Sequence, residues 1–169
     1  PFRYLDYEVG PGVLIPRPET EVIVDEVLHQ ISSMPDPISI VDLGAGAGGI
    51  SIALATETHG KKEVHLIAVE KSKEALVWLR KNIQKHDVNI RVLEDSAANA
   101  LQGIKCDVVV ANPPYLPDGQ PIPQELNFEP DMALFGGPGD GMRDPIEFIQ
   151  AAARLLKIGG LLAMEHNEV

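Results

Sequence analysis

The sequence lacks much of what several classes of protein require. It has a single cysteine, Cys106, which excludes an intramolecular disulfide and fits a reducing compartment, the cytoplasm or, in a eukaryote, the mitochondrion. Its five histidines are scattered without metal-ligand spacing, so we expect no bound metal. No apolar run reaches the roughly 18 residues of a membrane span, and residues 1–4 lack the plan of a signal peptide. We therefore expect no membrane partner.

Basic residues are scarce relative to acidic ones. Lys and Arg total 14 against 25 Asp and Glu, a formal charge of −11. Such a charge opposes binding to a phosphate backbone and argues against nucleic acid as the main substrate. The remaining composition, 44% hydrophobic and 23% charged over 169 residues, is ordinary for a globular domain that buries one core.

Strand and helix patterns alternate along the chain, which predicts an α/β fold: a Rossmann-like sheet with helices on both faces. Residues 1–16 are expected to form a small β-hairpin split at Gly10-Pro11-Gly12, and residues 17–169 the core. Strands are expected at residues 38–43, 64–69, 90–93, 107–111 and 161–164, and helices at residues 18–31, from 50, 72–83 and 144–157. The final strands of such a sheet are expected to be missing from this sequence.

Two features follow the fourth predicted strand. Residues 116–142 are too many for a simple connection, and loops of that length are usually functional, so we expect this one to lie over the site. Asp144 to Glu147 then has the pattern of a capping box at a helix start.

A glycine-rich turn, Gly44-Ala45-Gly46-Ala47-Gly48, joins the first predicted strand to a helix. Glycines there let the backbone pass close to a ligand, because no Cβ intervenes. Glu70 ends the second strand, where a carboxylate can accept both ribose hydroxyls of a nicotinamide or an S-adenosylmethionine cofactor. Asp42 either holds the loop backbone or reaches the cofactor's amino-acid part, and Asp95 is either an adenine contact or a surface turn acid. The pattern predicts a cofactor site without separating the two cofactors.

Asn112-Pro113-Pro114-Tyr115 follows the fourth strand, at the carboxyl edge where open α/β sheets bind ligands. The two prolines remove N–H donors, so nearby carbonyls point out as acceptors. The side-chain oxygen of Asn112 and the carbonyl of Pro113 can each accept a hydrogen from a planar –NH₂ group, whose face the Tyr115 ring covers. Held in line with a methyl sulfonium, such a nitrogen can be methylated. We assign this turn to catalysis, with Asn112 also beside the cofactor.

Together these motifs resemble those of the release-factor glutamine methyltransferases, the HemK/PrmC group. Leu14 to Glu21 is similar to the family's first motif, Asp42 to Gly48 to its cofactor loop, Asn112 to Tyr115 to its catalytic turn, and residues 128–141 to its long loop. The resemblance implies that S-adenosyl-L-methionine donates a methyl group, leaving S-adenosyl-L-homocysteine. The acceptor it implies is the side-chain N5 of glutamine in the Gly-Gly-Gln tripeptide of peptide chain release factors.

The sequence departs from that family in two places. The helical domain that helps relatives to hold the release factor does not precede Pro1, so we expect this chain to be a core piece. Glu94-Asp95-Ser96-Ala97 stands where many relatives have Asp-Trp, so the aromatic side chain that stacks on adenine is absent.

Three other functions remain open on the sequence. An adenine-N6 DNA or RNA methyltransferase would use a similar turn, because the exocyclic amine of adenine is also planar. The acidic balance and residues 17–21 favour the protein substrate over this alternative. A nicotinamide-dependent oxidoreductase would use Gly44, Gly46 and Gly49 but leaves the Asn112 turn unexplained. A module that binds the cofactor without catalysis would not need that turn.

Overall fold

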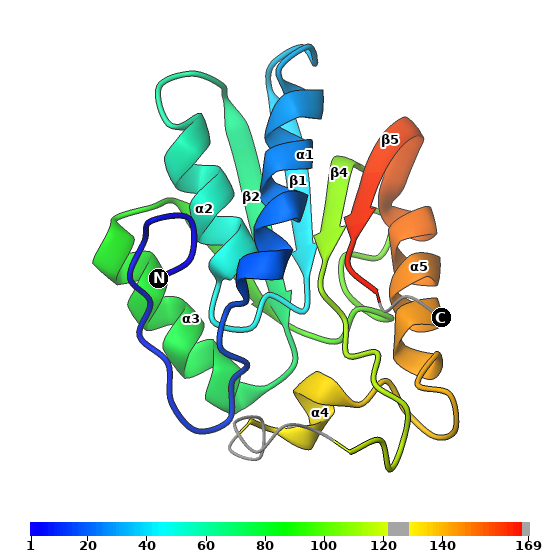
Figure 1. The fold of residues 1–169 in the computed structure, drawn as a ribbon. Coiled ribbons are helices and arrows are strands. Elements are labelled where there is room, and N and C mark those ends of the chain that lie inside the picture. Colours follow the sequence, from blue (N-terminus) through cyan, green and yellow to red (C-terminus); the bar gives the residue numbers. More distant parts are fainter. Residues whose placement is uncertain (122–128, 167–169) are drawn as a thin grey trace.

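The chain folds around one parallel β-sheet (Figure 1). The computed structural model describes residues 1–121 and 129–166, and Phe128 of the long-loop motif lies outside them. The strands in the described residues have the order β3-β2-β1-β4-β5, and every neighbouring pair is parallel. Their bounds are β1 Ile38–Leu43, β2 Val64–Glu70, β3 Ile90–Glu94, β4 Cys106–Ala111 and β5 Leu156–Met164. The helices are η1 Pro18–Thr20, α1 Glu21–Ile31, α2 Gly49–Thr58, α3 Lys73–His86, α4 Asp131–Leu134 and α5 Arg143–Leu155.

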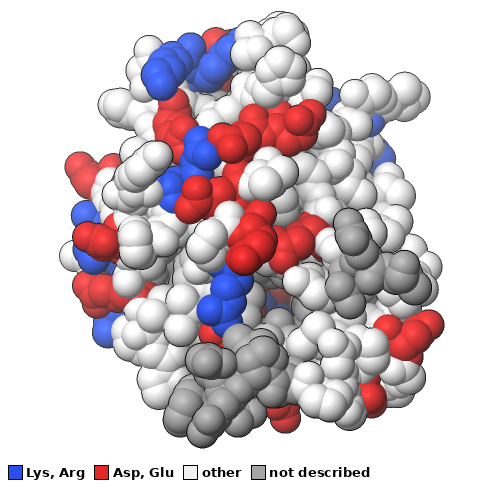
Figure 2. All heavy atoms as spheres, viewed as in Figure 1, with Lys and Arg blue, Asp and Glu red and all other residues white. Residues whose placement is uncertain are grey.

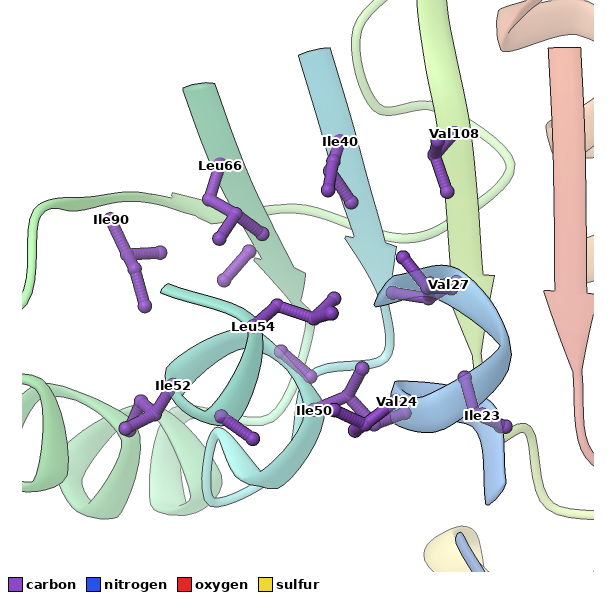
Figure 3. Packing of buried hydrophobic residues seen from close by; sticks show 14 of the residues in the cluster. Ile23, Val24, Val27, Ile40, Ile50, Ile52, Leu54, Leu66, Ile90 and Val108 are labelled. Atoms are coloured by element: carbon purple, nitrogen blue, oxygen red, sulfur yellow. The ribbon is translucent and has the colours of Figure 1, made fainter. Parts of the chain in front are cut away.

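The sheet is buried on both faces, as the predicted Rossmann-like fold requires. Side chains of a strand alternate between faces, so Ile38 and Ile40 of β1 join one core cluster while Val41 and Leu43 join the other. Helices α1, α2 and α3 cover the first face and α5 covers the second. Figure 3 shows the first cluster, in which side chains of α1 and α2 meet those of the strands. This packing fixes the strand ends, from which the site is built.

The hairpin predicted for residues 1–16 is wrong. The segment has one isolated bridge, Phe2 with Leu5, and no described strand pairs across Gly10-Pro11-Gly12. Its backbone groups are satisfied by side chains of α3 instead: Asn82 accepts from the Glu8 N–H at 2.7 Å and donates to the Glu8 carbonyl at 2.9 Å. Because a side chain of α3 already binds these backbone groups, no second strand is needed to satisfy them.

At the start of α3, Ser72 caps the helix as expected, since its Oγ accepts from the Ala75 N–H at 3.2 Å. Both boundaries predicted for α5, in contrast, differ from the structure. The capping box at Asp144 is wrong: α5 begins at Arg143, its first turn has no side-chain cap, and the Asp144 N–H donates to the Gly136 carbonyl. At its other end α5 stops at Leu155, two residues before the predicted helix end, and β5 begins at Leu156, which pairs with Cys106 of β4 before a register shift.

The sheet reverses its order at β1, which lies between β2 and β4. Connections β1 to β2 to β3 run to one side, and β4 and β5 then fill the other. The loops that leave β1 and β4 must therefore part in opposite directions, which opens a crevice at the carboxyl ends of these strands. In Figure 1, α4 lies below these strand ends.

Acidic side chains dominate the face viewed in Figure 2, where α1 and α2 lie, with a few basic side chains among them. Arg3 of the N-terminal segment donates to Asp25 of α1 and to both carboxylate oxygens of Glu57 of α2. No helix within the described residues is long and apolar enough to cross a membrane.

Candidate functional site

A cleft of about 1020 Å³, its open mouth included, lies at the carboxyl ends of the strands. The turn after β1, the end of β2, the loop after β3 and the turn after β4 all contribute to it. The long loop adds Pro130, Met132 and Ala133, so the prediction that this loop lies over the site is confirmed for its described part. Of the predicted cofactor residues, those lining this cleft are Asp42, Gly44, Ala45, Gly46, Ala47, Glu70, Asp95 and Asn112.

The glycine turn needs its glycines for more than one reason. Gly44, Gly46 and Gly48 all have positive φ, a backbone conformation that L side chains rarely adopt. Gly46 has open space where a Cβ would lie, so a ligand can approach its backbone there. Gly48 does not line the cleft, and a Cβ on it would lie 2.8 Å from side-chain atoms of Ile52 and Leu79. Gly48 is thus required mainly by its φ of +93°, because the two nearest atoms are the ends of flexible side chains that can shift.

Glu70 is a buried carboxylate at the end of β2. Its Oε2 accepts from the Gly46 N–H at 2.9 Å, and its Oε1 accepts from the Ser72 N–H at 2.7 Å. A carboxylate has about four acceptor positions, so two remain for a ligand in the cleft. The same side chain therefore ties the glycine turn to the start of α3 and offers acceptors to the cleft.

Asp42 is fully buried beneath the glycine turn. Its Oδ2 accepts from Ser51 Oγ at 2.5 Å, whereas its Oδ1 has no partner among the described residues. Burial raises the pKa of Asp42 to about 7, with Ser51 opposing the shift and the charge of Glu70 adding to it. A buried acceptor without a partner is costly, and a cation in the cleft would satisfy it.

Asp95 follows β3 and lines the cleft. Its N–H donates to the Glu70 carbonyl, and its Oδ1 accepts from the Ser96 N–H at 2.8 Å. One carboxylate oxygen is thus engaged in the turn while the side chain still borders the cleft, so both predicted roles remain compatible with its position.

No group of three or more His, Cys, Asp or Glu in residues 1–121 and 129–166 could hold a metal ion.

A smaller pocket of about 480 Å³, counted in the same way, adjoins the cleft at the turn after β4. Asn112 and Pro114 line both cavities, whereas Pro113 and Tyr115 line only the smaller one. The turn is therefore the boundary between a large cavity and a small one.

Hydrogen bonds connect the turn to two residues that the sequence reasoning missed. Asn112 Nδ2 donates to Thr20 Oγ1 at 3.0 Å, and Thr20 Oγ1 donates to Glu165 Oε2 at 2.6 Å. Tyr115 donates its hydroxyl hydrogen to Glu165 Oε1 at 3.0 Å. Burial, followed by the charge of Glu165, raises the pKa of Tyr115 to about 12, so the phenol stays protonated and keeps donating.

The only sequence signal for Glu165 was its position. It follows β5 directly, as Glu70 ends β2, so its side chain reaches the same carboxyl edge. Thr20 lay within the motif at residues 14–21 but was given no role. Arg17 of that motif lines both cavities and pairs with the buried Glu129 of the long loop.

Hydrogen bonds and a close backbone contact at Gly136 join the long loop to the catalytic turn. The N–H groups of Tyr115 and Leu116 both donate to the Leu134 carbonyl. A Cβ on Gly136 would lie 1.9 Å from the Gly141 carbonyl oxygen and 2.8 Å from that of Pro114. The loop thus packs backbone against backbone here, which explains why glycine occupies these positions.

Curated relatives match nearly all of this chain. A release factor glutamine methyltransferase of Bifidobacterium longum is 37% identical over 182 residues, covering 99% of this chain and 60% of the relative. Those of Streptomyces coelicolor, with 40% identity and 99% and 59% coverage, and of Escherichia coli, with 35% identity and 98% and 59% coverage, are similar. The chain spans about 60% of the length of these relatives. The resemblance drawn from the motifs is confirmed.

Solved structures share the fold at low sequence identity. The 16S rRNA N2 G1207 methyltransferase of Thermus thermophilus has a TM-score of 0.64 at 20% identity, over 89% of this chain and 34% of that one. Precorrin-6y C5,15-methyltransferase of Geobacter metallireducens has a TM-score of 0.62 at 18% identity, over 94% of this chain and 67% of that one. These similarities confirm the predicted Rossmann-like methyltransferase sheet.

A family model described as methyltransferase small domain matches residues 23–126. This range is more than half of the chain and holds the glycine turn, Glu70, Asp95 and the turn from Asn112 to Tyr115. The chain therefore belongs to the methyltransferase small domain family.

Proposed function

We propose that this chain carries the active site of a protein-(glutamine-N5) methyltransferase, which uses S-adenosyl-L-methionine to methylate the Gly-Gly-Gln glutamine of a peptide chain release factor. The observation that carries the proposal is the pair of cavities that meet at Asn112. The large one has polar groups for a nucleoside cofactor, and the small one is lined by the whole turn from Asn112 to Tyr115. Relatives named release factor glutamine methyltransferase match nearly the whole chain at 35% to 40% identity.

The residues of the large cleft fit S-adenosylmethionine in charge and shape. Asp42 Oδ1 is a buried acceptor without a described partner, and the cofactor's ammonium group would satisfy it. Glu70 retains acceptor positions for ribose hydroxyls, and the open backbone of Gly46 lets the cofactor lie close to the turn. Asp95 lies where it can contact the adenine. When bound, the cofactor supplies an electrophilic methyl group on a sulfonium.

The residues of the small pocket act on the glutamine side chain. The Asn112 amide oxygen and the Pro113 carbonyl each accept one hydrogen of the substrate –NH₂, which fixes the nitrogen and raises its electron density. The Pro114 ring restrains the turn, and the Tyr115 ring lies against the amide plane. Asn112 and Pro113 would hold this nitrogen in line with the sulfonium methyl of the bound cofactor, so that methyl transfer would leave S-adenosyl-L-homocysteine. The nitrogen then loses a proton to solvent, because methylation makes that proton acidic.

Mass spectrometry of a release factor incubated with the protein and S-adenosylmethionine tests this function. We expect one added methyl group on the glutamine of Gly-Gly-Gln, and none on a release factor whose glutamine is replaced by glutamate. Duplex DNA offered in a parallel reaction should remain unmethylated. Methylation of DNA adenine with an unmodified release factor would replace this proposal by the adenine-N6 alternative.

A further inference from the structure

The carboxylate of Glu165 accepts two hydrogen bonds from side chains at the catalytic turn and next to it. Glu165 accepts on one oxygen from Thr20 and on the other from Tyr115, at 2.6 and 3.0 Å. Thr20 is buried and in turn accepts from Asn112 at 3.0 Å. These four side chains come from η1, from the turn after β4 and from the end of β5, so their contact depends on the tertiary fold.

The protonation of this chain of hydrogen bonds has only one consistent arrangement. An ionised carboxylate accepts and cannot donate, so Thr20 must give its single hydroxyl hydrogen to Glu165. The Thr20 oxygen can then only accept from its other neighbour. The amide of Asn112 must therefore turn its –NH₂ toward Thr20, because a threonine without a free hydrogen would leave the amide oxygen unpaired on that side.

We propose that Thr20 and Glu165 are positioning residues that set the orientation of the Asn112 amide. With Nδ2 committed to Thr20, Oδ1 faces the reaction centre and can accept from the substrate –NH₂. The reverse orientation would present a donor to another donor and would repel the glutamine amide. The inference rests on the proposed function for the identity of the substrate, but the orientation itself is a property of this chain alone.

The same network has a consequence for substrate choice. The two acceptors that Asn112 and Pro113 present select an amide nitrogen over a carboxylate oxygen, because glutamate would place lone pairs against lone pairs. By fixing the orientation of Asn112, Glu165 thus contributes to the selection of glutamine. Through Tyr115, the same carboxylate also fixes the aromatic ring that lies against the amide plane.

Three variants separate this role from a general structural one. Thr20→Val keeps the shape but removes the hydroxyl, and we expect methyl transfer at saturating cofactor to fall by about 100-fold, as when one oriented group of an active site is lost. Thr20→Ser restores the hydroxyl and should recover most of that loss. Glu165→Gln can donate to Thr20, which frees the Thr20 hydrogen for Asn112 Oδ1 and turns the amide over. Its transfer should fall as far as that of Thr20→Val.

The matched control is Thr58→Val in α2. Thr58 is also buried, and its hydroxyl donates only to backbone carbonyls, at 2.6 Å to Leu54 and 3.5 Å to Ala55. We expect Thr58→Val to keep wild-type transfer, and all four variants to keep wild-type affinity for S-adenosylmethionine. Transfer by Thr20→Val within about threefold of wild type would overturn the inference, as would Thr20→Ser losing as much as Thr20→Val.

A second measurement needs no substrate. In ¹⁵N-labelled protein with S-adenosylhomocysteine, the side-chain –NH₂ signals of Asn112, identified by their loss in Asn112→Ala, should show one proton protected from exchange. Thr20→Val and Glu165→Gln should remove the protection and Thr20→Ser should keep it. An unprotected wild-type amide overturns the inference. If instead the protection pattern holds while wild-type protein fails to methylate a release factor, the proposed function fails and the amide orientation stands.

Discussion

The two cavities that meet at Asn112 are built in different ways. In the large cleft, Glu70 binds Gly46, which is 24 residues away, and both lie at the ends of neighbouring strands. Behind the catalytic turn, Thr20, which itself lines the large cleft, binds Asn112 across 92 residues and Glu165 of the small pocket across 145. The predicted cofactor residues therefore lie in short motifs at adjacent strand ends, although other segments also line the cleft. The substrate side is assembled from segments that meet only when the whole sheet has formed.

The first way to test this division is to remove the residue that both cavities share. Asn112→Ala should leave the dissociation constant of S-adenosylmethionine near wild type, because we assign the side chain to the substrate amide. Methyl transfer should fall by about 10²–10³-fold, the loss seen when one oriented hydrogen-bonding group is removed from an active site. Single-turnover transfer to a release factor, with cofactor binding measured by calorimetry, gives both quantities.

Two results would contradict the division at Asn112. A variant that retains more than about a third of wild-type turnover would remove Asn112 from the chemistry. A variant whose cofactor affinity falls as steeply as its turnover would place the side chain on the cofactor side instead.

The second way is to remove an acceptor from the cofactor side. Glu70→Ala should weaken S-adenosylmethionine binding by about 1–3 kcal/mol, the range for hydrogen bonds to a charged group. It also frees the Gly46 and Ser72 N–H groups, so the unfolding free energy should fall as well.

The matched control for Glu70 is Glu94→Ala. Glu94 pairs with Glu70 in the β2–β3 register and also ends its strand, but it is exposed and does not line the cleft. Its loss should leave cofactor affinity unchanged in the same titration. Equal affinities for the Glu70 variant and wild type would exclude Glu70 from the site.

The third way acts on the backbone that joins the loop to the catalytic turn. Gly136→Ala places a Cβ against the carbonyls of Gly141 and Pro114, so one of these segments must move. Overpacking of this kind costs about 1–3 kcal/mol of stability, and displacement of Pro114 should lower methyl transfer more than cofactor affinity. Urea unfolding and transfer assays measure the two effects.

Gly139→Asn is the control for the loop. Gly139 has positive φ, which asparagine tolerates better than other residues, and no atom lies within 4 Å of its Cβ position. We expect near wild-type stability and transfer. A Gly136→Ala variant that behaves like this control would show that the loop does not hold the turn.

The different ways in which the two cavities are built explain which features the sequence could predict. The parallel sheet and both assigned motifs follow from local patterns, since strands, glycines and prolines restrict the backbone where they stand. The hairpin at residues 1–16 could not be excluded, because Asn82 replaces the partner strand and nothing near Glu8 in the sequence indicates it. Thr20 and Glu165 were missed for the same reason, since each acquires its role through contacts at least 50 residues away.

The smallest expected effect on methyl transfer concerns the charge of Asp42. Burial raises its pKa to about 7, so the folded protein without ligand binds a proton that the unfolded chain releases near its ordinary pKa of 3.8. The folded state therefore holds the proton more tightly, and the unfolding free energy should decrease as pH rises from about 4 to 7, then level off. A cationic ammonium beside Oδ1 favours the ionised form, so cofactor binding should expel this proton.

Calorimetric titrations measure that proton directly. In buffers of different ionisation enthalpy near pH 6.5, binding of S-adenosylmethionine should release part of one proton, and affinity should weaken by at most about tenfold per pH unit below pH 7, the limit for one coupled proton. Asp42→Asn, which keeps the shape and removes the charge, should abolish both the proton release and the pH dependence. Because Asp42 lies on the cofactor side, methyl transfer at saturating cofactor should respond far less to this variant than to Asn112→Ala. If Asp42→Asn bound the cofactor with the pH dependence of the wild type, the titration would belong to another group. The unpartnered Oδ1 of Asp42 would then have no assigned ligand.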